Sequence, residues 1–159
     1  ALPIYLIVRK LNHLVAEGLD FDQVVDGITA YQAKTKLLFV LAKVDNLVKN
    51  GRLSKLVGTV VGLLNIRMVG EASKTGTLEL LQKARGQKKA IKAAFDELLK
   101  AGYAGGHITI AHRNNEKFIE QFSELVREKF AQASIEVLPT SGLCSFYAEE
   151  GGLLMGYEI

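Results

Sequence analysis

The chain has 159 residues, of which 48% are hydrophobic and 23% are charged, a composition typical of a globular protein that buries roughly two-thirds of its unfolded surface. Its formal net charge of +3 comes from 20 Lys and Arg residues against 17 Asp and Glu residues, an excess too small to indicate a nucleic-acid partner by itself. No apolar run reaches the roughly 20 residues that cross a bilayer, so we expect a soluble protein with one domain as the default.

The first 34 residues are expected to form two helices. Apolar residues follow helical spacing from Ile4 to Val15, and Gly18 ends the pattern. Asp20 is placed to cap a second helix that runs through Tyr31. Because the chain begins without a methionine and within an apolar pattern, we interpret it as a fragment of a longer protein.

A central strand and a buried helix are expected next. Residues 36–41 read KLLFVL, an apolar run without alternation that is typical of a strand covered on both faces. A short helix is expected over residues 43–49, and Asn50-Gly51 is its expected end. Residues 53–64 are apolar nearly all round, which predicts a helix buried on more than one side.

Strands and helices alternate in the rest of the chain. The expected elements are a hairpin (65–72 and 77–81), a helix (90–99), a strand (107–112), a helix (118–130), a strand (135–138), a loop (139–142) and a last strand (153–158). Because a hairpin occurs among strand–helix–strand units, the predicted fold class is α/β, with a mixed β-sheet packed with helices.

Arg52 is the first candidate functional residue. It lies in the sequence NGRLSK, between the end of one expected helix and the start of the next. A guanidinium binds a carboxylate or phosphate through two parallel hydrogen bonds, and the amino end of a helix adds roughly half a positive charge. On this hypothesis, the apolar helix that follows would line a channel for an apolar chain attached to the anion. The alternatives are an exposed turn arginine with Ser54 as an ordinary helix cap, and a helix that only packs in the core.

A second basic element contains Arg85, Lys88, Lys89 and Lys92, whose spacing predicts that all four lie on one helical face. Cations at the amino end oppose the helix dipole by about 0.3 to 1 kcal/mol each when exposed, which favours an acidic partner surface or a phosphate. The alternatives are a solvated lysine face and a basic-surface or nucleic-acid-binding module. No aromatic residues interleave with these cations to stack bases, which disfavours nucleic acid.

The single cysteine, Cys144, cannot form an internal disulfide, so a reduced cytoplasm is the expected compartment. A small hydrolase that uses Cys144 or Ser145, with His107 or His112 as base, is a further hypothesis that no sequence motif supports. His112 is instead expected to be a capping or turn residue. The sequence has no zinc, dinucleotide or phosphate-loop motif, so neither a metal nor a cofactor is predicted.

Three segments together resemble the C-terminal domain of the DegV family of bacterial fatty-acid-binding proteins. They are residues 39–67, the KARGQKKA segment at 83–90, and GGLLMGYE at 151–158. The resemblance implies a helical inter-domain region over residues 1–34 and a C-terminal lipid-binding domain over residues 35–159. It also implies that the N-terminal domain of the family is absent from this chain.

The resemblance implies a function as well. Family members bind a long-chain fatty acid without catalysis and present its carboxylate to a separate fatty acid kinase for phosphorylation. By position, Arg52 would contact the carboxylate, with Ser54 in the same turn, while Ser145 and Tyr147 would complete the donor set. Tyr147 stands where many members carry a histidine, and a neutral phenol still donates a hydrogen bond to a carboxylate. The neighbouring acidic residues, 149 and 150, are expected to face solvent or a partner.

In the same way, Arg85, Lys88 and Lys89 would meet the kinase. The expected partners are therefore a long-chain fatty acid, the fatty acid kinase and the absent N-terminal domain, with transient membrane contact allowed and no nucleic acid. Threonine and serine residues of the N-terminal domain supply further head-group contacts in the family. We therefore expect the present chain alone to bind a fatty acid poorly.

Overall fold

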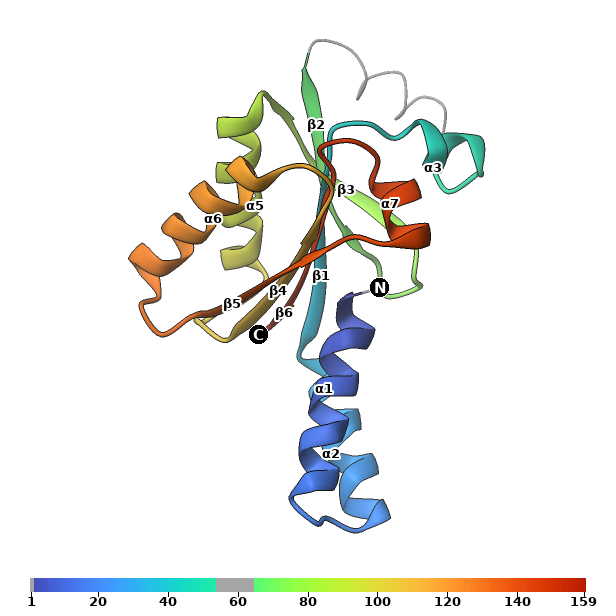
Figure 1. Cartoon of the computed structure of the whole chain (residues 1–159), viewed down its shortest axis with the longest axis vertical. Coiled ribbons are helices and arrows are strands. Elements are labelled where there is room, and N and C mark those ends of the chain that lie inside the picture. The colour runs from blue at the N-terminus through green and yellow to red at the C-terminus, as the bar shows by residue number, and fades with distance from the viewer. Residues whose placement is uncertain (1, 54–64) are drawn as a thin grey trace.

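The structure is a computed structural model that describes residues 2–53 and 65–159 (Figure 1). Its elements in chain order are α1 (Leu2–Ala16), α2 (Phe21–Ala33), β1 (Thr35–Leu41), α3 (Asp45–Lys49), β2 (Ile66–Ala72), β3 (Leu78–Arg85), α5 (Gln87–Lys100), β4 (His107–His112), α6 (Glu116–Lys129), β5 (Ser134–Pro139), α7 (Gly142–Ala148) and β6 (Leu153–Glu158). In this part of the chain, no helix is long and apolar enough to cross a membrane.

The strands form one six-stranded sheet in the order β3-β2-β1-β6-β4-β5. Strand β1 pairs antiparallel with β2 and with β6 at the centre of the sheet. Strands β4 and β5 form a parallel pair that helix α6 connects, since a parallel connection requires a crossover. The observed fold is therefore α/β with a mixed sheet, and the predicted fold class is confirmed.

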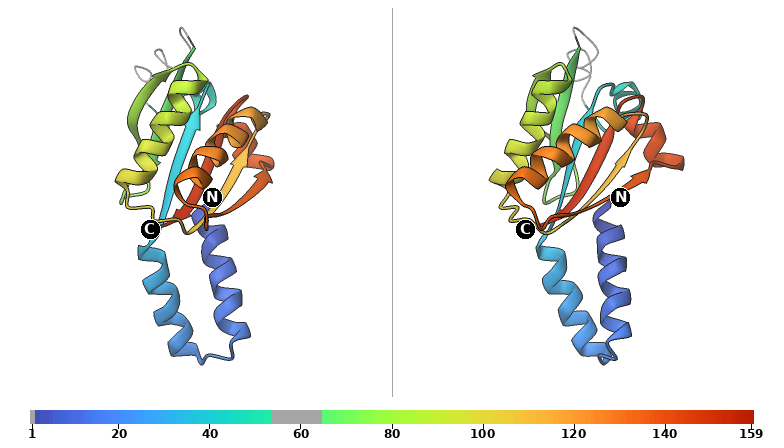
Figure 2. Two further views of the ribbon diagram at one scale, coloured as in Figure 1. Left: turned by 90° about the vertical axis from the view of Figure 1, so that its left-hand side faces the viewer. Right: turned by 60° about the vertical axis from the view of Figure 1, so that its left-hand side comes forward.

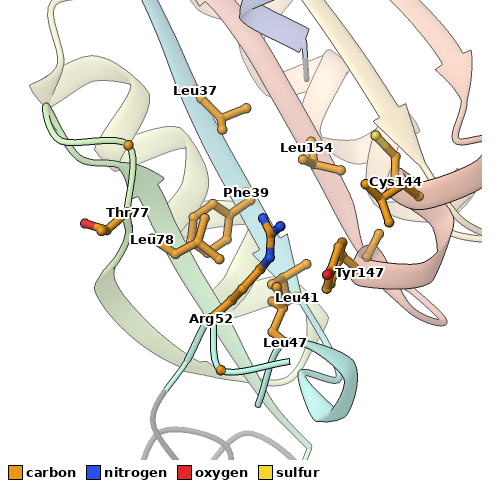
Figure 3. A pocket seen from close by; sticks show the side chains of 14 residues that line it. Leu37, Phe39, Leu41, Leu47, Arg52, Thr77, Leu78, Cys144, Tyr147 and Leu154 are labelled. Atoms are coloured by element: carbon orange, nitrogen blue, oxygen red, sulfur yellow. The ribbon is translucent and has the colours of Figure 1, made fainter. Parts of the chain in front are cut away.

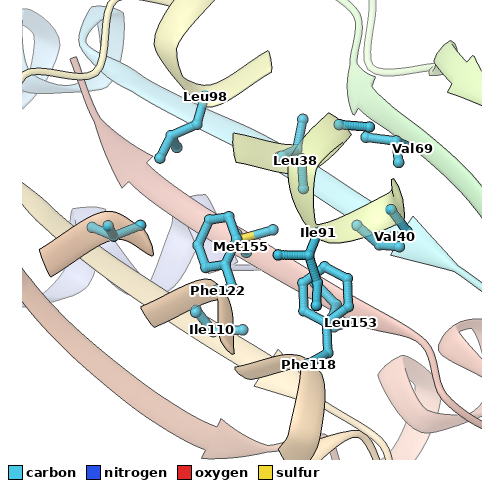
Figure 4. Close-up of a cluster of buried hydrophobic side chains, with 14 of the residues drawn as sticks. Leu38, Val40, Val69, Ile91, Leu98, Ile110, Phe118, Phe122, Leu153 and Met155 are labelled. Carbon is cyan, nitrogen blue, oxygen red and sulfur yellow. The ribbon is translucent and has the colours of Figure 1, made fainter. Parts of the chain in front are cut away.

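Helices α5 and α6 cover one face of the sheet (Figure 2). The even-numbered residues Leu38 and Val40 of β1 point to this face and pack in the main core with Phe118, Phe122 and Met155 (Figure 4). Phe118 and Phe122 stack with their ring centroids 6.0 Å apart. Fully burying side chains of this size contributes about 1.5 to 3 kcal/mol each, so this layer holds the sheet in place.

Helices α1, α3 and α7 lie on the other face. The apolar side of α1 contacts the sheet through Leu2 and Leu6, which are buried. Gly156 of β6 makes this approach close, because a Cβ there would lie 3.0 Å from Leu2 Cβ. Helices α1 and α2 together form a hairpin that projects beyond the sheet (Figure 1).

Strand β3 contains a bulge that changes the face of the sheet to which its side chains point. Val69 of β2 is paired with Gln82 while Gly70 is paired with Leu80, so Leu81 is an extra residue in β3. As a result, Leu80 packs on the face of α3 and α7, whereas Gln82 donates to Glu97 of α5 on the opposite face. One edge strand thus supplies side chains to both layers.

The expected elements agree with the observed ones apart from helix α7 and the position of Arg85. The capping box between Asp20 and Gln23 begins α2, as predicted for Asp20. Residues 142–148 form helix α7, where the sequence analysis predicts only a loop up to Gly142 and then the last strand. Arg85 ends strand β3 and is not part of a helix. The helix expected over residues 53–64 lies, from residue 54 on, outside the described residues.

Candidate functional site

A cavity of about 560 Å³ lies on the face of the sheet that bears α3 and α7 (Figure 3). Its floor is made by Leu37, Phe39 and Leu41, alternate residues of β1 that all point to this face. Leu154 of β6 continues the floor, and residues of α3, α7 and the β2–β3 turn form the walls. Known ligand cavities measure about 300 to 1,000 Å³ and are mostly apolar, so this one has the size and lining of a binding site.

Phe39 gains its place on the floor because Gly70 has no side chain. A Cβ at Gly70 would lie 2.8 Å from Phe39 Cε2, so only a glycine lets the ring lie across the neighbouring strand. Phe39 then packs with Leu41, Leu47 and Met68 in a second apolar cluster beneath the cavity. The floor of the cavity is therefore fixed by packing within the domain.

Arg52 lies at the rim of this cavity. The turn after α3 folds back, since Arg52 N donates to Leu47 O at 2.8 Å and Gly51 adopts a φ of 69°. The guanidinium carbon of Arg52 lies 4.8 Å from the ring centroid of Tyr147, a cation–π contact. Arg52 is exposed and forms no ion pair with the described residues. Its positive charge thus lies beside the apolar walls of the cavity.

Helix α7 supplies the opposite wall through Cys144, Tyr147 and Ala148. It is tied to α3, because Asn46 N donates to Glu149 Oε2 at 3.0 Å and Asn46 Nδ2 donates to Phe146 O at 2.8 Å. Glu149 is only 9% exposed, so the expectation that it faces solvent or a partner is wrong. A buried carboxylate is stabilised there because it accepts from the amino end of α3.

The other acidic residue, Glu150, is exposed as expected. Its carboxylate accepts from Asn114 Nδ2 at 3.1 Å and lies 3.8 Å from Arg113 Nε.

The structure does not bring Ser145 into the cavity. Its hydroxyl donates to Thr140 Oγ1 at 2.8 Å, and it is absent from the cavity lining. Residues 145 and 147 are two positions apart on α7, so they face different sides of the helix. The geometry therefore places Tyr147 beside Arg52 but turns Ser145 away. Ser54 lies outside the described residues.

The basic residues Arg85, Lys88 and Lys89 are close in sequence but do not share one helical face. Gly86 has a φ of 81° and separates strand β3 from α5, so Arg85 is a strand residue and the one-face prediction for it is wrong. Its neighbour Ala84 is buried on the side of α5, which directs Arg85 to the opposite face. Lys88 and Lys89 lie in the first turn of α5 and line a groove between α5 and α6.

Neither histidine proposed as a base approaches the cysteine. The cavity lining includes Cys144 and, within the described part of the chain, no histidine. His112 Nδ1 accepts from Asn115 N at 3.2 Å, which confirms its prediction as a turn and capping residue. His107 bonds to Arg9 and Ser134 near α1 instead. Among the described residues, no group of three or more His, Cys, Asp or Glu side chains is arranged to hold a metal ion.

Arg67 is a half-buried cation that is not predicted from the sequence as a functional residue. It lies on the face of α5, where its Nη2 donates to Gln87 Oε1 at 3.4 Å. Its Nε and Nη1 atoms are buried, with no hydrogen-bond partner in the part of the chain that the structure describes. Burial lowers the pKa of the Arg67 guanidinium. No sequence pattern marks this residue, because its burial results from the packing of α5 on β2.

Fold and site together define an α/β domain with an apolar cavity and a cation at its rim, a geometry that suits an amphipathic anion. The chain belongs to the DegV family: residues 1–157 match the family model described as "Uncharacterised protein, DegV family". The chain is 77% identical, over 154 residues, to a DegV domain-containing protein of Streptococcus pneumoniae, and the match covers 97% of this chain and 55% of that protein. The chain thus spans about half the length of the curated relatives that it matches.

Two solved structures show the same fold. One is the fatty acid kinase (Fak) B3 protein of Streptococcus pneumoniae loaded with linoleic acid, with a TM-score of 0.96 and 76% identity over 98% of this chain and 56% of that chain. The other is a DegV family protein of Eubacterium eligens loaded with heptadecanoic acid, with a TM-score of 0.92 and 36% identity over 97% of this chain and 56% of that chain. Each of these two proteins is loaded with a fatty acid.

Proposed function

We propose that this chain is the C-terminal part of a protein that binds a long-chain fatty acid, with the acyl chain in the cavity and the carboxylate at Arg52. The observation that carries the proposal is the exposed guanidinium of Arg52, 4.8 Å from the Tyr147 ring at the rim of an apolar cavity. The solved relatives loaded with linoleic and heptadecanoic acid support the ligand class.

Affinity and orientation come from different parts of this site. Each buried methylene contributes about 0.8 kcal/mol, so a long acyl chain supplies on the order of 10 kcal/mol before the costs of binding. A hydrogen bond to a charged group contributes about 1.5 to 3 kcal/mol. Arg52 therefore orients the carboxylate and adds a smaller share of the affinity, while Tyr147 offers a second, neutral donor.

The test is a fatty acid titration of the delipidated protein, combined with native mass spectrometry to identify lipid that co-purifies. Arg52→Ala is expected to weaken carboxylate binding about 10- to 100-fold, which corresponds to the loss of one charge-assisted hydrogen bond. The matched control is Lys49→Ala, which removes an exposed cation from the end of α3 that does not line the cavity. Equal affinities for Arg52→Ala and the wild type would contradict the assignment.

We also propose that residues 1–34 form an inter-domain region, that residues 35–159 form the lipid-binding domain, and that an N-terminal domain completes the head-group site. The chain spans 55% of a relative at 77% identity, which leaves room for such a domain in proteins of this kind. A version extended at the N-terminus to the length of the relatives should bind fatty acid more tightly than the 159-residue chain. Equal affinities would contradict this division.

A second part of the proposal is that the bound fatty acid is presented to a separate fatty acid kinase, and that Arg85, Lys88 and Lys89 contact it. The description of the Streptococcus pneumoniae relative as a fatty acid kinase protein supports this partner. No residue of this chain is assigned a catalytic role. The nucleic-acid-binding alternative has no supporting observation and is not proposed.

The kinase contact is tested by measuring lipid binding and kinase-dependent phosphorylation of the bound fatty acid in parallel. Arg85→Ala should leave fatty acid affinity unchanged and lower the rate of phosphorylation. Lys129→Ala, which removes a cation from the distant end of α6, is the matched control and should change neither quantity. Unaltered phosphorylation with Arg85→Ala would refute the docking assignment.

A further inference from the structure

The floor of the cavity has a definite far end. Along β1 it passes from Leu41 through Phe39 to Leu37, a distance of about 13 Å at the usual rise of a strand. Figure 3 shows Leu37 beyond Phe39 on β1, on the side away from Arg52 and Leu47. A ligand whose carboxylate is held at Arg52 therefore extends its apolar end toward Leu37.

On β6, the residue that follows Leu154 on the cavity face is Gly156, and helix α1 covers this glycine beside Leu37. Leu37 is paired with Gly156 of β6, whereas Phe39 is paired with Leu154. A Cβ at Gly156 would lie 3.0 Å from Leu2 Cβ and 3.1 Å from Leu2 C, so the first turn of α1 rests directly on this glycine. Leu2 itself is buried. The cavity is thus bounded at this end by Leu37 with α1 immediately behind it.

The side walls do not limit the ligand in the same way. Thr77 of the β2–β3 connection and Leu78 at the start of β3 lie to one side of the floor, while Cys144 of α7 lies to the other (Figure 3). Leu37 is the floor residue on the line from Arg52 to α1. Its side chain is partly exposed, which leaves room for it to be replaced without disrupting the core.

We infer that Leu37 sets the longest acyl chain that the cavity accepts, by stopping the methyl end of the ligand in front of α1. This inference rests on the proposed function, since it concerns the same cavity. It assigns Leu37 to chain-length selection and Arg52 to the carboxylate, so the two residues control separate properties of one ligand.

The test measures affinities of the delipidated protein, extended to the length of its relatives, for a series of saturated straight-chain fatty acids. Leu37→Ala removes about three carbon atoms of the wall, and each further methylene that becomes buried raises affinity about fourfold. The best-bound chain should therefore become longer for Leu37→Ala and shorter for Leu37→Phe. Leu80→Ala is the control: it is the same truncation on the same face, but Leu80 does not line the cavity.

The possible outcomes distinguish this inference from the proposed fatty-acid-binding function on which it rests. A wild type that binds no fatty acid would overturn both. A wild type that binds fatty acids while Leu37→Ala and Leu37→Phe keep its length profile would overturn the role of Leu37 alone. A shift of the profile with both Leu37 variants, in opposite directions and without a shift for Leu80→Ala, would establish it. Thermal denaturation of each variant confirms that the proteins compared are folded.

Discussion

The close contact between Gly152 and α7 gives the sharpest prediction about how the cavity is held. A Cβ at Gly152 would overlap the carbonyl oxygen of Ala148 and lie 2.7 Å from its carbonyl carbon. Both are backbone atoms, so they cannot rotate away as a side chain does. Gly152 itself has no left-handed φ, so an alanine there is opposed by this overlap and not by its own backbone conformation. Gly152→Ala must therefore displace the end of α7, which carries Tyr147.

The expected cost of such overpacking is about 1 to 3 kcal/mol, which lowers the midpoint of thermal unfolding by about 3 to 10 °C in a domain of this size. Fatty acid affinity should fall as well, because the Tyr147 wall moves away from Arg52. The control is Gly106→Ala, whose Cβ would have its three nearest contacts with Glu158, at 3.3 Å from Cβ and Oε2 and 3.8 Å from the backbone oxygen, so it is tightly packed but does not overlap the backbone.

Differential scanning calorimetry and a fatty acid titration check these two expectations. An unfolding midpoint equal to that of Gly106→Ala would refute the packing argument. A lower midpoint with unchanged affinity would instead show that α7 is not a wall of the ligand site.

Further predictions concern the core and the charged groups. Burial raises the pKa of Tyr103 to about 12, so the unfolded chain loses the phenol proton at a lower pH than the folded chain does. The stability that the neutral phenol contributes should therefore be present below about pH 10 and be lost as the pH rises toward 12. Ultraviolet absorbance and unfolding midpoints measured across this pH range check this expectation. Arg67→Met should raise the unfolding free energy by about 0.5 to 1 kcal/mol, because it removes a half-buried charge that has no anion partner among the described residues. Arg9→Met should lower the unfolding free energy, because Arg9 pairs with a carboxylate at 2.7 Å. Changes in unfolding free energy of the same sign for the two arginine variants would contradict this reasoning. Phe122→Ala should lower the unfolding free energy by about 3 to 5 kcal/mol, while Phe21→Ala, at a residue that is 80% exposed, should stay within about 0.5 kcal/mol of the wild type; urea denaturation distinguishes the two variants.

Most of the fold is predictable from the sequence because most of its helices and strands have a clear apolar period, while the central strand β1 is indicated by its continuous apolar run. Helix α7 is different. It has seven residues, fewer than an isolated helix needs to be stable in water, and it is held by Glu149 and Gly152 after its end. The contact of Glu149 joins it to Asn46, 103 residues away in the sequence, so no local pattern contains it. The misplacement of Arg85 has a local cause, since the positive φ of Gly86 separates it from the lysines of α5.

The candidate site is only partly predictable. The turn sequence predicts an anion-binding role for Arg52, and this role stays a prediction. Its proximity to Tyr147 depends on how α3 and α7 pack, which the family resemblance anticipates and periodicity does not. Ser145 shows the limit of placing residues by position alone, because it is on the correct helix but faces Thr140. The cavity floor consists of the alternate residues Leu37, Phe39 and Leu41 of β1. The sequence does not reveal this alternation, because the residues between them are also apolar.

The bulge in β3 determines where this edge strand can change its length during evolution. Leu81 is the extra residue, and it is partly exposed to solvent. Its removal leaves a regular ladder in which Leu80 still faces the cavity layer and Gln82 still faces α5. A deletion elsewhere in the strand shifts the residues on one side of it by a single position, which exchanges their faces and exposes apolar side chains. Leu81 is thus the site in β3 where a homologue can be one residue shorter and keep the same two layers.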